Sequence, residues 1–563
     1  MTYPIDGGEA VLEAFRNLGI RYIVSSPGSE WGSVWEAIAR QKVSGAAGPE
    51  YLSCWHETLA VNIAMGYTLA TGRMQAVMLH AGVGLLQGSA GIHSAHIQNV
   101  PLVVLSGESI SYGEQAGFDP GAQWYQNLSV VGGPQRLVEP YVKWASQVAS
   151  VDTLYESILR AGHMAQRTPA GPVYVNVPIE TQLREWAKPA RLRQALPFVP
   201  PRAPTADIER VAALLRDAKN PVITTEAGGS SRASYAALMA LAEAAAIAVV
   251  ETPSSVFSSF PKDHPLHGGP GIAPYFETTD LVLVVRSRIP WYPPRKFPPN
   301  ATIVLIDENP YRPHMVYQNL HADWVLEGDA TFTLDSLATL ARGAPLAPVE
   351  ERRARHAAQH AKREEERLRT VEDAKTKRPI HPIWLCAALS EALPEGTTYV
   401  DESVSDRAAV EAHLRNKGPL SFIKVRGALG QGLGHAIGVK LAMPERTVVA
   451  LMGDGAFLYN PVTQSLGYSM RDGLPILIVV FNNGGYKAMK NNQLTYYPDG
   501  AGRRHGIFPG ETIGGPDYAT LGQPFGCWGR RVDDPNELVD ALREAHRATL
   551  EGKTAILNVV LES

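Results

Sequence analysis

Two short polar segments, each following an apolar run, contain side chains suited to hold a divalent metal ion. The first is Gly453-Asp454-Gly455, and the second, separated from it by 26 residues, is Asn482-Asn483. Either segment alone would be an ordinary turn. Together they place a carboxylate and an amide at the ends of two strands, where hard oxygen donors suit Mg²⁺ or Ca²⁺, and the glycines let backbone amides approach a phosphate. The pattern predicts a metal ion that bridges a diphosphate to the protein.

The elements that must position these residues alternate between strands and helices. In the first third of the chain, the pattern predicts helices over 7–19 and 57–72 and strands near 21–27, 74–80, 100–108 and 171–178. The helix at 57–72 is rich in alanine, so we expect it to be mostly buried. Strands that alternate with helices indicate a parallel, doubly wound sheet.

Two further units follow the first. The stretch 196–207 is rich in proline and indicates a linker. A second α/β pattern follows it, and a third runs from about 379 to the end. We predict an α/β protein of three doubly wound parallel-sheet domains, with boundaries at 1–188, 189–345 and 346–563. Residues 349–375 are charged nearly throughout, which favours a solvated helix or linker.

The composition excludes several functional classes. The 563 residues include 52 basic and 56 acidic ones, so no nucleic-acid surface is indicated, and no apolar run is long enough to span a membrane. The first residues lack the basic and apolar regions of a secretory signal, which favours a cytoplasmic protein. Three scattered cysteines indicate neither a disulfide framework nor a zinc site. The glycine loops lack the G-x-G-x-x-G spacing, which disfavours a nicotinamide cofactor.

The two metal-binding segments resemble the diphosphate-anchoring motif of thiamine diphosphate (ThDP) enzymes. The resemblance implies that Asp454, Asn483 and the backbone oxygen of Gly485 bind the metal ion. A catalytic glutamate activates the cofactor by a hydrogen bond to its aminopyrimidine ring, and the His56-Glu57 pair at the start of the alanine-rich helix matches it. Glutamate in the first turn of a helix is also simply favourable, but the metal motif elsewhere in the chain supports the role of Glu57.

The resemblance also implies the other cofactor contacts. The segment "RGALGQGLGHAIGV" places Leu429 where family members bend the cofactor with a large aliphatic side chain. The segment "DESVS" places Ser405 and the Val404 backbone at the diphosphate. The remaining diphosphate contacts implied by the family motif are Gly455, Ala456 and Tyr486.

The resemblance covers nearly the whole chain and is greatest to benzoylformate decarboxylase and its relatives. His80 stands where those enzymes carry an active-site histidine, although a lone histidine at a strand end is more often structural. Ser29 stands where they have a serine that binds the substrate carboxylate. The implied reaction is cleavage of a 2-oxo acid with loss of CO₂, leaving an enamine on ThDP that is protonated to release an aldehyde. The implied assembly is at least a homodimer, and more specifically a homotetramer.

The sequence departs from the decarboxylase pattern at several places. The second active-site histidine expected near "RSRIPWYPP" is replaced by Trp291 and Tyr292. Gln123 resembles a catalytic glutamine of acetolactate synthases, so carboligation of the enamine to a second carbonyl compound is the alternative reaction. The 495–515 loop, with Arg503, Arg504 and His505, is either a lid over an anionic substrate or a solvated loop.

Three further interpretations concern cofactors and substrate. FAD is not expected, because "EAGGSSRAS" does not match its site in the middle domain. A cofactor-binding protein without catalysis, or a nucleotide-binding module, is disfavoured by Glu57 and by the missing glycine fingerprint. Five aromatic residues could line the substrate site or simply pack in the core: Trp31, Trp35, Trp124, Trp291 and Tyr292.

Overall fold

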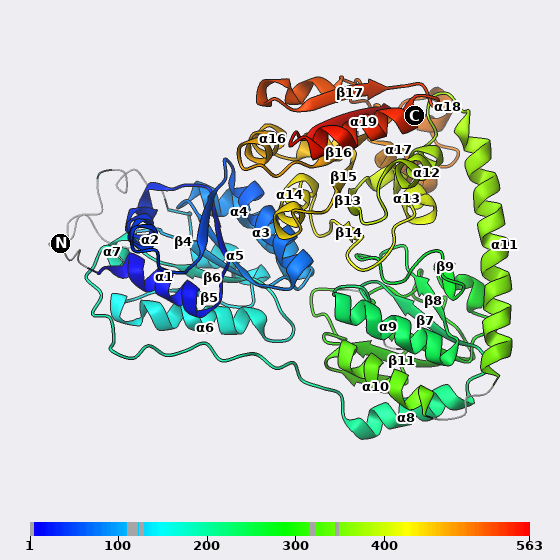
Figure 1. Ribbon diagram of the computed structural model, residues 1–563, viewed down its shortest axis with the longest axis horizontal. Helices are drawn as coiled ribbons and strands as arrows, with labels where there is room; N and C mark the ends of the chain where they lie inside the picture. Colours follow the sequence, from blue (N-terminus) through cyan, green and yellow to red (C-terminus); the bar gives the residue numbers. More distant parts are fainter. Residues whose placement is uncertain (1–4, 110–121, 123–128, 316–320, 344–347, 563) are drawn as a thin grey trace. The chain divides into compact units, whose positions relative to one another are not determined.

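The computed structural model describes residues 5–109, 122, 129–315, 321–343 and 348–562. The chain divides into two compact units, each of which is described by itself. Unit 1 comprises residues 1–199, 426–443 and 461–468, and unit 2 comprises the remaining residues. The described residues form three six-stranded sheets with helices between the strands (Figure 1), and every strand pairing within these sheets is parallel. The predicted fold class is confirmed.

The first sheet lies in unit 1 and has the strand order β2-β1-β3-β4-β6-β5. Its strands are β1 (Tyr22–Ser25), β2 (Glu50–Ser53), β3 (Gln75–Leu79), β4 (Leu102–Ser106), β5 (Ala145–Gln147) and β6 (Val173–Asn176). Its helices are α1 (Gly7–Asn17), α2 (Gly32–Ser44), α3 (Glu57–Thr71), α4 (Val83–Ile97), α5 (Pro134–Val138), α6 (Leu154–Gln166) and α7 (Ile179–Gln182).

The third sheet repeats the topology of the first. Its order is β14-β13-β15-β16-β18-β17, so both sheets read 2-1-3-4-6-5 when each is numbered from its own first strand. Its strands are β13 (Thr398–Glu402), β14 (Phe422–Lys424), β15 (Val448–Gly453), β16 (Leu477–Asn482), β17 (Trp528–Val532) and β18 (Ala555–Val560). The helices of this region are α12 (Pro382–Ala392), α13 (Arg407–His413), α14 (Gly432–Ala442), α15 (Asp454–Tyr459), α16 (Val462–Arg471), α17 (Lys487–Tyr496), α18 (Ala501–His505) and α19 (Leu538–Leu550).

The middle sheet has a different order, β12-β11-β10-β7-β8-β9. Its strands are β7 (Pro221–Thr225), β8 (Ala248–Glu251), β9 (His267–Pro270), β10 (Leu281–Val285), β11 (Thr302–Asp307) and β12 (Trp324–Glu327), and its helices are α8 (Thr205–Asp217), α9 (Arg232–Ala245) and α10 (Ala330–Arg342). This order is that of doubly wound sheets with one central reversal of strand order.

The strand order fixes where a ligand can bind in the first and third sheets. In each, the chain crosses to opposite sides of its first strand, so the order reverses between β1 and β3 and again between β13 and β15. The loops at the carboxyl ends of those two strands then diverge and leave a crevice. In sheets of this topology the reversal is the usual position of a ligand.

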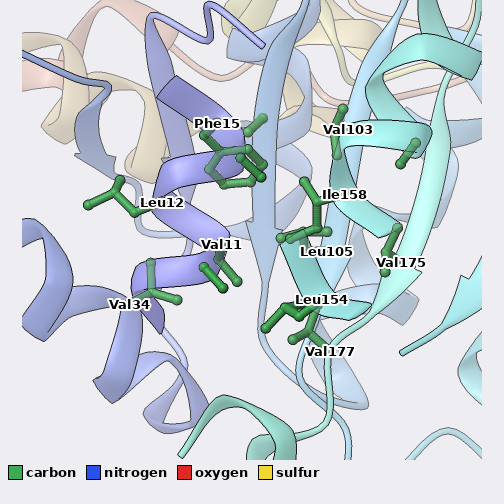
Figure 2. Close-up of a cluster of buried hydrophobic side chains, with 14 of the residues drawn as sticks. Val11, Leu12, Phe15, Val34, Val103, Leu105, Leu154, Ile158, Val175 and Val177 are labelled. Carbon is green, nitrogen blue, oxygen red and sulfur yellow. The ribbon is translucent and has the colours of Figure 1, made fainter. Parts of the chain in front are cut away.

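The core of the first domain forms where apolar faces of α1 and α6 cover the sheet. Figure 2 shows Val11, Leu12 and Phe15 of α1 on one side, with Leu154 and Ile158 of α6 near the β4 and β6 side chains. All five are essentially inaccessible to solvent. The period of about 3.6 residues in the α1 sequence, which predicted this helix, is the pattern that buries one face.

Helices α3 and α14 of unit 1 touch along glycines. A Cβ built on Gly66 of α3 would lie 2.3 Å from the carbonyl oxygen of His435, and one built on Gly438 of α14 would lie 2.2 Å from that of Ile63. The side chain of Gln431, just before α14, also donates to Oδ1 of Asn62 at 3.0 Å. The backbones of the two helices are therefore in direct contact, which only glycine allows.

The charged segment forms one helix, α11 (Val349–Lys375), as the pattern allowed, but the helix is not solvated on all sides. It lies beside β9, α12 and α13 within unit 2 (Figure 1). Arg352 is fully buried, and its guanidinium donates to the carbonyl oxygens of Ala218 and Ala245 at 2.8 and 2.6 Å. One charged face of α11 is therefore part of the interior. None of the helices in the described ranges combines the length and apolarity needed to cross a membrane.

We expect Gly66→Ala to destabilise the fold, because the added methyl group must push α3 and α14 apart. Overpacking of this kind typically lowers the free energy of unfolding by about 1–3 kcal/mol. Gly32→Ala is the control, since Gly32 begins α2 and a Cβ there meets nothing within 4 Å. Urea denaturation measures both variants. Equal stabilities would contradict the close contact.

Candidate active site

The predicted metal motif lies at the carboxyl end of β15, beside the reversal of strand order. Asp454 follows Gly453 directly and begins α15, and its side chain is 98 % buried. Its Oδ1 accepts from the Gly455 amide at 2.7 Å, and its Oδ2 accepts from the Gly484 and Gly485 amides at 2.8 and 3.1 Å. Burial raises the pKa of this carboxyl. Asp454 thus ties the end of β15 to the turn after β16.

The second half of the motif forms a turn after β16. Asn482 is the last residue of this strand, and its amide donates to Asn558 of β18 at 3.0 Å. The next residue, Asn483, points its Oδ1 at the Gly485 amide at 3.1 Å. Gly484 has φ of +77°, a conformation that favours glycine. The structure therefore brings Asp454, Asn483 and Gly485 together, the three residues that the resemblance singled out.

Two neighbouring segments complete this part of unit 2. A Cβ on Gly455 would lie 2.5 Å from the ring of Tyr486, so only glycine fits beneath this tyrosine. Ser405 lies in a 3-10 turn after β13, and a Cβ on Gly453 would lie 3.0 Å from the Ser403 carbonyl of the same segment. Val404 has φ of +51°, which is strained for a β-branched residue. Strained backbone of this kind often occurs at binding sites.

Asp406 is a further residue of this site that the sequence analysis missed. Its carboxyl is buried, and within the described part of the chain its Oδ2 has no hydrogen-bond partner. Burial, opposed by Lys487 and reinforced by Asp454, raises its pKa to about 6. A second buried carboxyl near Asp454 increases the attraction of this position for a cation.

The predicted acid Glu57 lies at the start of α3, in unit 1. The backbone of His56 is extended, and its Nδ1 accepts from the Thr58 amide at 3.2 Å, so the histidine caps the helix and Glu57 is its first residue. Glu57 is half-buried, and no hydrogen bond among the described residues uses its carboxylate. His56 therefore caps the helix, and the carboxylate of Glu57 is available to bind a ligand.

His80 lies at the carboxyl end of β3 and is paired with a buried glutamate. Its Nδ1 lies 2.8 and 3.1 Å from the two carboxylate oxygens of Glu30. The side chain of Glu30 is fully buried, and its Oε1 also accepts from the Ala81 amide at 2.7 Å. The hydrogen bond to Glu30 raises the pKa of His80, against the opposing effect of burial. His80 itself keeps 27 % of its side chain exposed.

Glycines hold open the space around this pair. A Cβ on Gly28 would lie within 2.6 Å of both Glu30 and His80, so the loop after β1 lies directly on the pair. Ser29, the predicted carboxylate-binding serine, is the exposed residue between Gly28 and Glu30. A Cβ on Gly84 would lie 2.9 Å from the Cβ of His80 and 3.2 Å from Oε1 of Glu57. The structure therefore groups Ser29, His80 and Glu57 around two glycines.

Leu429 projects from a turn of unit 1 that precedes α14. The turn contains Gly427 and Gly430, with φ of +89° and +78°, and the leucine keeps 48 % of its surface exposed. Ser94 of α4 holds the turn through Gln431 Oε1 at 2.9 Å and through the Arg426 carbonyl. A large apolar side chain left exposed on a fixed turn is available to contact a ligand.

Several predicted residues lie elsewhere or outside the described ranges. Gln123 and Trp124 are outside the described residues. Trp291 is buried in the core of the middle sheet, and Tyr292 is 83 % exposed. Trp31 is a core residue whose indole donates to the Leu79 carbonyl at 3.0 Å. For Trp31 and Trp291, core packing is therefore the correct interpretation.

The long loop near 495–515 returns to the metal motif. The Ile513 amide donates to the Gly484 carbonyl at 3.0 Å, and Lys490 pairs with Glu511 at 2.6 Å. Arg503 and Arg504 lie on the exposed α18 and donate to the carbonyl oxygens of Pro498 and Asp499 within the same loop. These contacts stabilise the loop, and a role as a lid stays a prediction.

The residues present fit a metal-bound diphosphate. Among the described residues, no group of three or more His, Cys, Asp or Glu side chains could hold a metal by itself. The motif does not need one, because two of its three donors are the Asn483 amide and the Gly485 carbonyl. Magnesium bound to a diphosphate commonly has few protein ligands. The unpartnered oxygen of Asp406 favours a cation here.

Sequence reasoning missed Glu30 and Asp406 for different reasons. Glu30 belongs to the "SPGSEWG" loop, where an acidic residue suggests solvent exposure, and only the fold brings it to His80. Asp406 directly follows the "DESVS" segment that the resemblance singled out, so its position near the motif was the available signal.

Comparison with known proteins supports this arrangement. Three family models match the chain: the N-terminal binding domain of thiamine pyrophosphate enzymes over residues 5–129, their central domain over 208–337 and their C-terminal binding domain over 406–559. The chain is 26 % identical to the Escherichia coli acetolactate synthase isozyme 3 large subunit, covering 99 % of this chain and 95 % of that protein. It is also 26 % identical to the Pseudomonas aeruginosa benzoylformate decarboxylase, covering 89 % and 88 %.

A solved structure shows the same fold. The ThDP-dependent 4-hydroxybenzoylformate decarboxylase of Rhodococcus jostii superposes with a TM-score of 0.78 over 99 % of both chains, at 23 % identity. The three matched domains, the two strand-end sites and these relatives agree, and we conclude that this chain belongs to the thiamine pyrophosphate enzyme family of decarboxylases and carboligases.

Proposed function

We propose that the protein is a ThDP- and Mg²⁺-dependent lyase that decarboxylates a 2-oxo acid. The balanced reaction takes a 2-oxo acid anion and a proton to an aldehyde and CO₂. The observation that carries this proposal is the ion pair between His80 and the buried Glu30, beside Glu57 and Ser29. A proton donor in this position suits release of an aldehyde.

The residues proposed to hold the cofactor divide between the two units. Asp454, Asn483 and the Gly485 carbonyl would bind the metal. Glu57 would contact the aminopyrimidine, and Leu429 would set the bend of the cofactor. The diphosphate would contact the Val404 backbone, Ser405, Gly455, Ala456 and Tyr486. When bound, ThDP supplies the carbanion that attacks the keto carbon and accepts its electrons when CO₂ leaves.

His80 is proposed to move the proton. An ionised Glu30 only accepts hydrogen bonds, so it fixes the proton of His80 on Nδ1 and leaves Nε2 for the substrate. The neutral ring then accepts a proton at Nε2, and the imidazolium donates it. Because the pKa of His80 is raised, the donating form persists to higher pH than in a free imidazole. Ser29, exposed on the adjacent loop, would orient the substrate carboxylate.

The second candidate function is carboligation. Acetolactate synthases of several organisms are among the relatives, at 24–26 % identity over nearly the whole chain. In such a reaction the enamine would form a carbon–carbon bond to a second carbonyl compound instead of accepting a proton. Gln123 would be the residue to examine. The paired His80 favours protonation, so we rank decarboxylation first.

We expect Asp454→Ala and Asn483→Ala to lose cofactor binding while the fold persists. Loss of a direct ligand should weaken ThDP affinity in Mg²⁺ by more than the roughly 10- to 100-fold that an outer-shell change costs. Titration calorimetry measures the affinity, and thermal unfolding checks the fold. Asp472→Ala is the control, because Asp472 is a surface residue paired with Arg471. Normal ThDP binding in the first two variants would contradict the metal assignment.

We expect Glu57→Gln to bind ThDP normally but to activate it poorly, because the amide cannot share a proton with the pyrimidine ring. Exchange of the cofactor C2 proton, followed by NMR, should slow by about 10²-fold or more. Glu50→Gln, which removes an exposed carboxylate paired with Arg21, should leave the exchange rate unchanged. An unchanged rate in Glu57→Gln would refute its role.

The same variants test the proposed assembly, at least a homodimer and more specifically a homotetramer. In such an assembly Glu57 of one chain would act with Asp454 of another. Mixed oligomers of Glu57→Gln and Asp454→Ala chains should then recover part of the activity that each lacks alone. Fully active monomers in light scattering would rule this out.

We expect a panel of 2-oxo acids, with and without aldehyde acceptors, to yield CO₂ and aldehyde in a ratio near one. His80→Ala should lower aldehyde formation by about 10²-fold and raise the share of hydroxyketone. Glu30→Gln removes the anion that raises the His80 pKa, so the alkaline limb of the aldehyde pH profile should move to lower pH. Glu36→Gln, an exposed glutamate near Arg40, is the control. Hydroxyketone as the main product of the unmodified enzyme would favour the carboligase.

A further inference from the structure

A large cavity lies within unit 2, and no residue of the predicted metal motif lines it. Its volume is about 420 Å³, within the range of small-molecule sites and far larger than one water molecule. Its wall comes from the carboxyl ends of β8 and β9, one face of α11, the end of α13 and the start of β14. The residues used below are Glu251, Ser258, Lys262, His267, Arg363, Glu364, His413, Arg415 and Asn416.

Three buried polar atoms of residues in this wall lack hydrogen-bond partners among the described residues. They are Ser258 Oγ, His413 Nδ1 and Asn416 Oδ1, whereas His267 Nε2 lies 3.6 Å from a carboxylate oxygen of Glu251. Each of the three side chains belongs to a residue that is more than nine-tenths buried. Buried polar atoms are normally paired, so three unpaired atoms beside one cavity favour a ligand with polar groups.

The cations of the wall are only partly matched by carboxylates. Glu364 pairs with Arg415 and, at 3.1 Å, with Arg367. Lys262 is buried, which lowers its pKa, and among the described residues it donates only to the carbonyl oxygens of Glu411 and Leu414, at 2.7 and 3.1 Å. Arg363 donates to the His267 carbonyl at 2.5 Å. Neither Lys262 nor Arg363 forms an ion pair with a carboxylate of the described chain.

The pairing of charges around the cavity leaves two cations without a carboxylate partner. Four cationic side chains line the cavity, namely Lys262, Arg363, Arg367 and Arg415. Of the four glutamates that line it, Glu366 is exposed, Glu364 pairs with Arg367 and Arg415, Glu411 pairs with Lys424 at 3.0 Å, and Glu251 lies 3.6 Å from His267. Burial lowers the pKa of His413 to about 4 and also lowers the pKa of His267. An anionic group would supply the partner that Lys262 and Arg363 lack.

We propose that this cavity binds a small organic monocarboxylate, held by Lys262 and Arg363, with a hydroxyl or amide group that bonds to Ser258 and Asn416. The site is separate from the proposed catalytic site and does not depend on it. The segment that forms its wall, from Glu411 to Asn416, continues the chain from Ser405 and Asp406 through α13. A ligand here would therefore act on the loop that precedes the metal motif.

The test uses the full-length chain loaded with ThDP and Mg²⁺ and a panel of hydroxylated monocarboxylates that are not 2-oxo acids: 3-hydroxybutyrate, mevalonate and gluconate. Butyrate, inorganic phosphate and the neutral 1,3-butanediol complete the panel. Calorimetry should detect binding of at least one acid. Arg363→Gln should weaken it about tenfold or more, the loss expected for a charge-assisted hydrogen bond. Ser258→Ala should weaken binding of the hydroxylated acid but not of butyrate.

The control is Lys362→Gln, which removes an equal charge from the exposed residue next to Arg363 and should leave the affinity unchanged. Binding that falls equally in the control and in Arg363→Gln would overturn the proposal, because the effect would then be general electrostatics. Binding of phosphate or the diol alone, or of no compound in the panel, would also overturn it.

Discussion

The reversal of strand order at two parallel sheets is the constraint on which the rest of this structure depends. Parallel strands place all their carboxyl ends at one edge, and the reversal separates the loops that follow two adjacent strands. Ser29 and His80 follow β1 and β3, and Ser405 and Asp454 follow β13 and β15, so the four stand at equivalent positions of two sheets with one topology. The chemistry of the site is then a matter of which side chains occupy those loops.

The glycines of the site follow from the same constraint. Loops that meet at the reversal of one sheet must pass close to each other, and Gly28 and Gly84 of unit 1 and Gly455 of unit 2 each lie where a Cβ would strike a neighbouring side chain. The middle sheet, which has another strand order, makes its own cavity at the ends of β8 and β9. In each sheet the features of interest therefore lie at the carboxyl ends of the strands, but the order in which the chain connects the strands determines where a crevice forms.

Much of this arrangement could be predicted from the sequence, because it depends on local patterns. The apolar runs identified the strands, the 3.6-residue period identified α1, and the spacing of Asp454 and Asn483 predicted that these two residues follow neighbouring strands. The partners of these residues could not be predicted, since Glu30 reaches His80 across 50 positions of the chain. The charged face of α11 was misjudged for a related reason. A run of arginine and glutamate predicts a solvent-exposed helix. The carbonyl oxygens that accept from Arg352 belong to residues more than 100 positions away in the sequence, so their presence could not be predicted from the run itself.

The burial of Glu30 has an evolutionary consequence for His80. A buried ion pair that loses one member leaves an uncompensated charge, at a cost of about 3–5 kcal/mol. A chain that replaced only the histidine would keep a carboxylate in the interior that, among the described residues, accepts only from the Ala81 amide. The two positions should therefore change together along a lineage, and a descendant that exchanges this histidine for a small residue should first acquire a neutral side chain in the loop after β1.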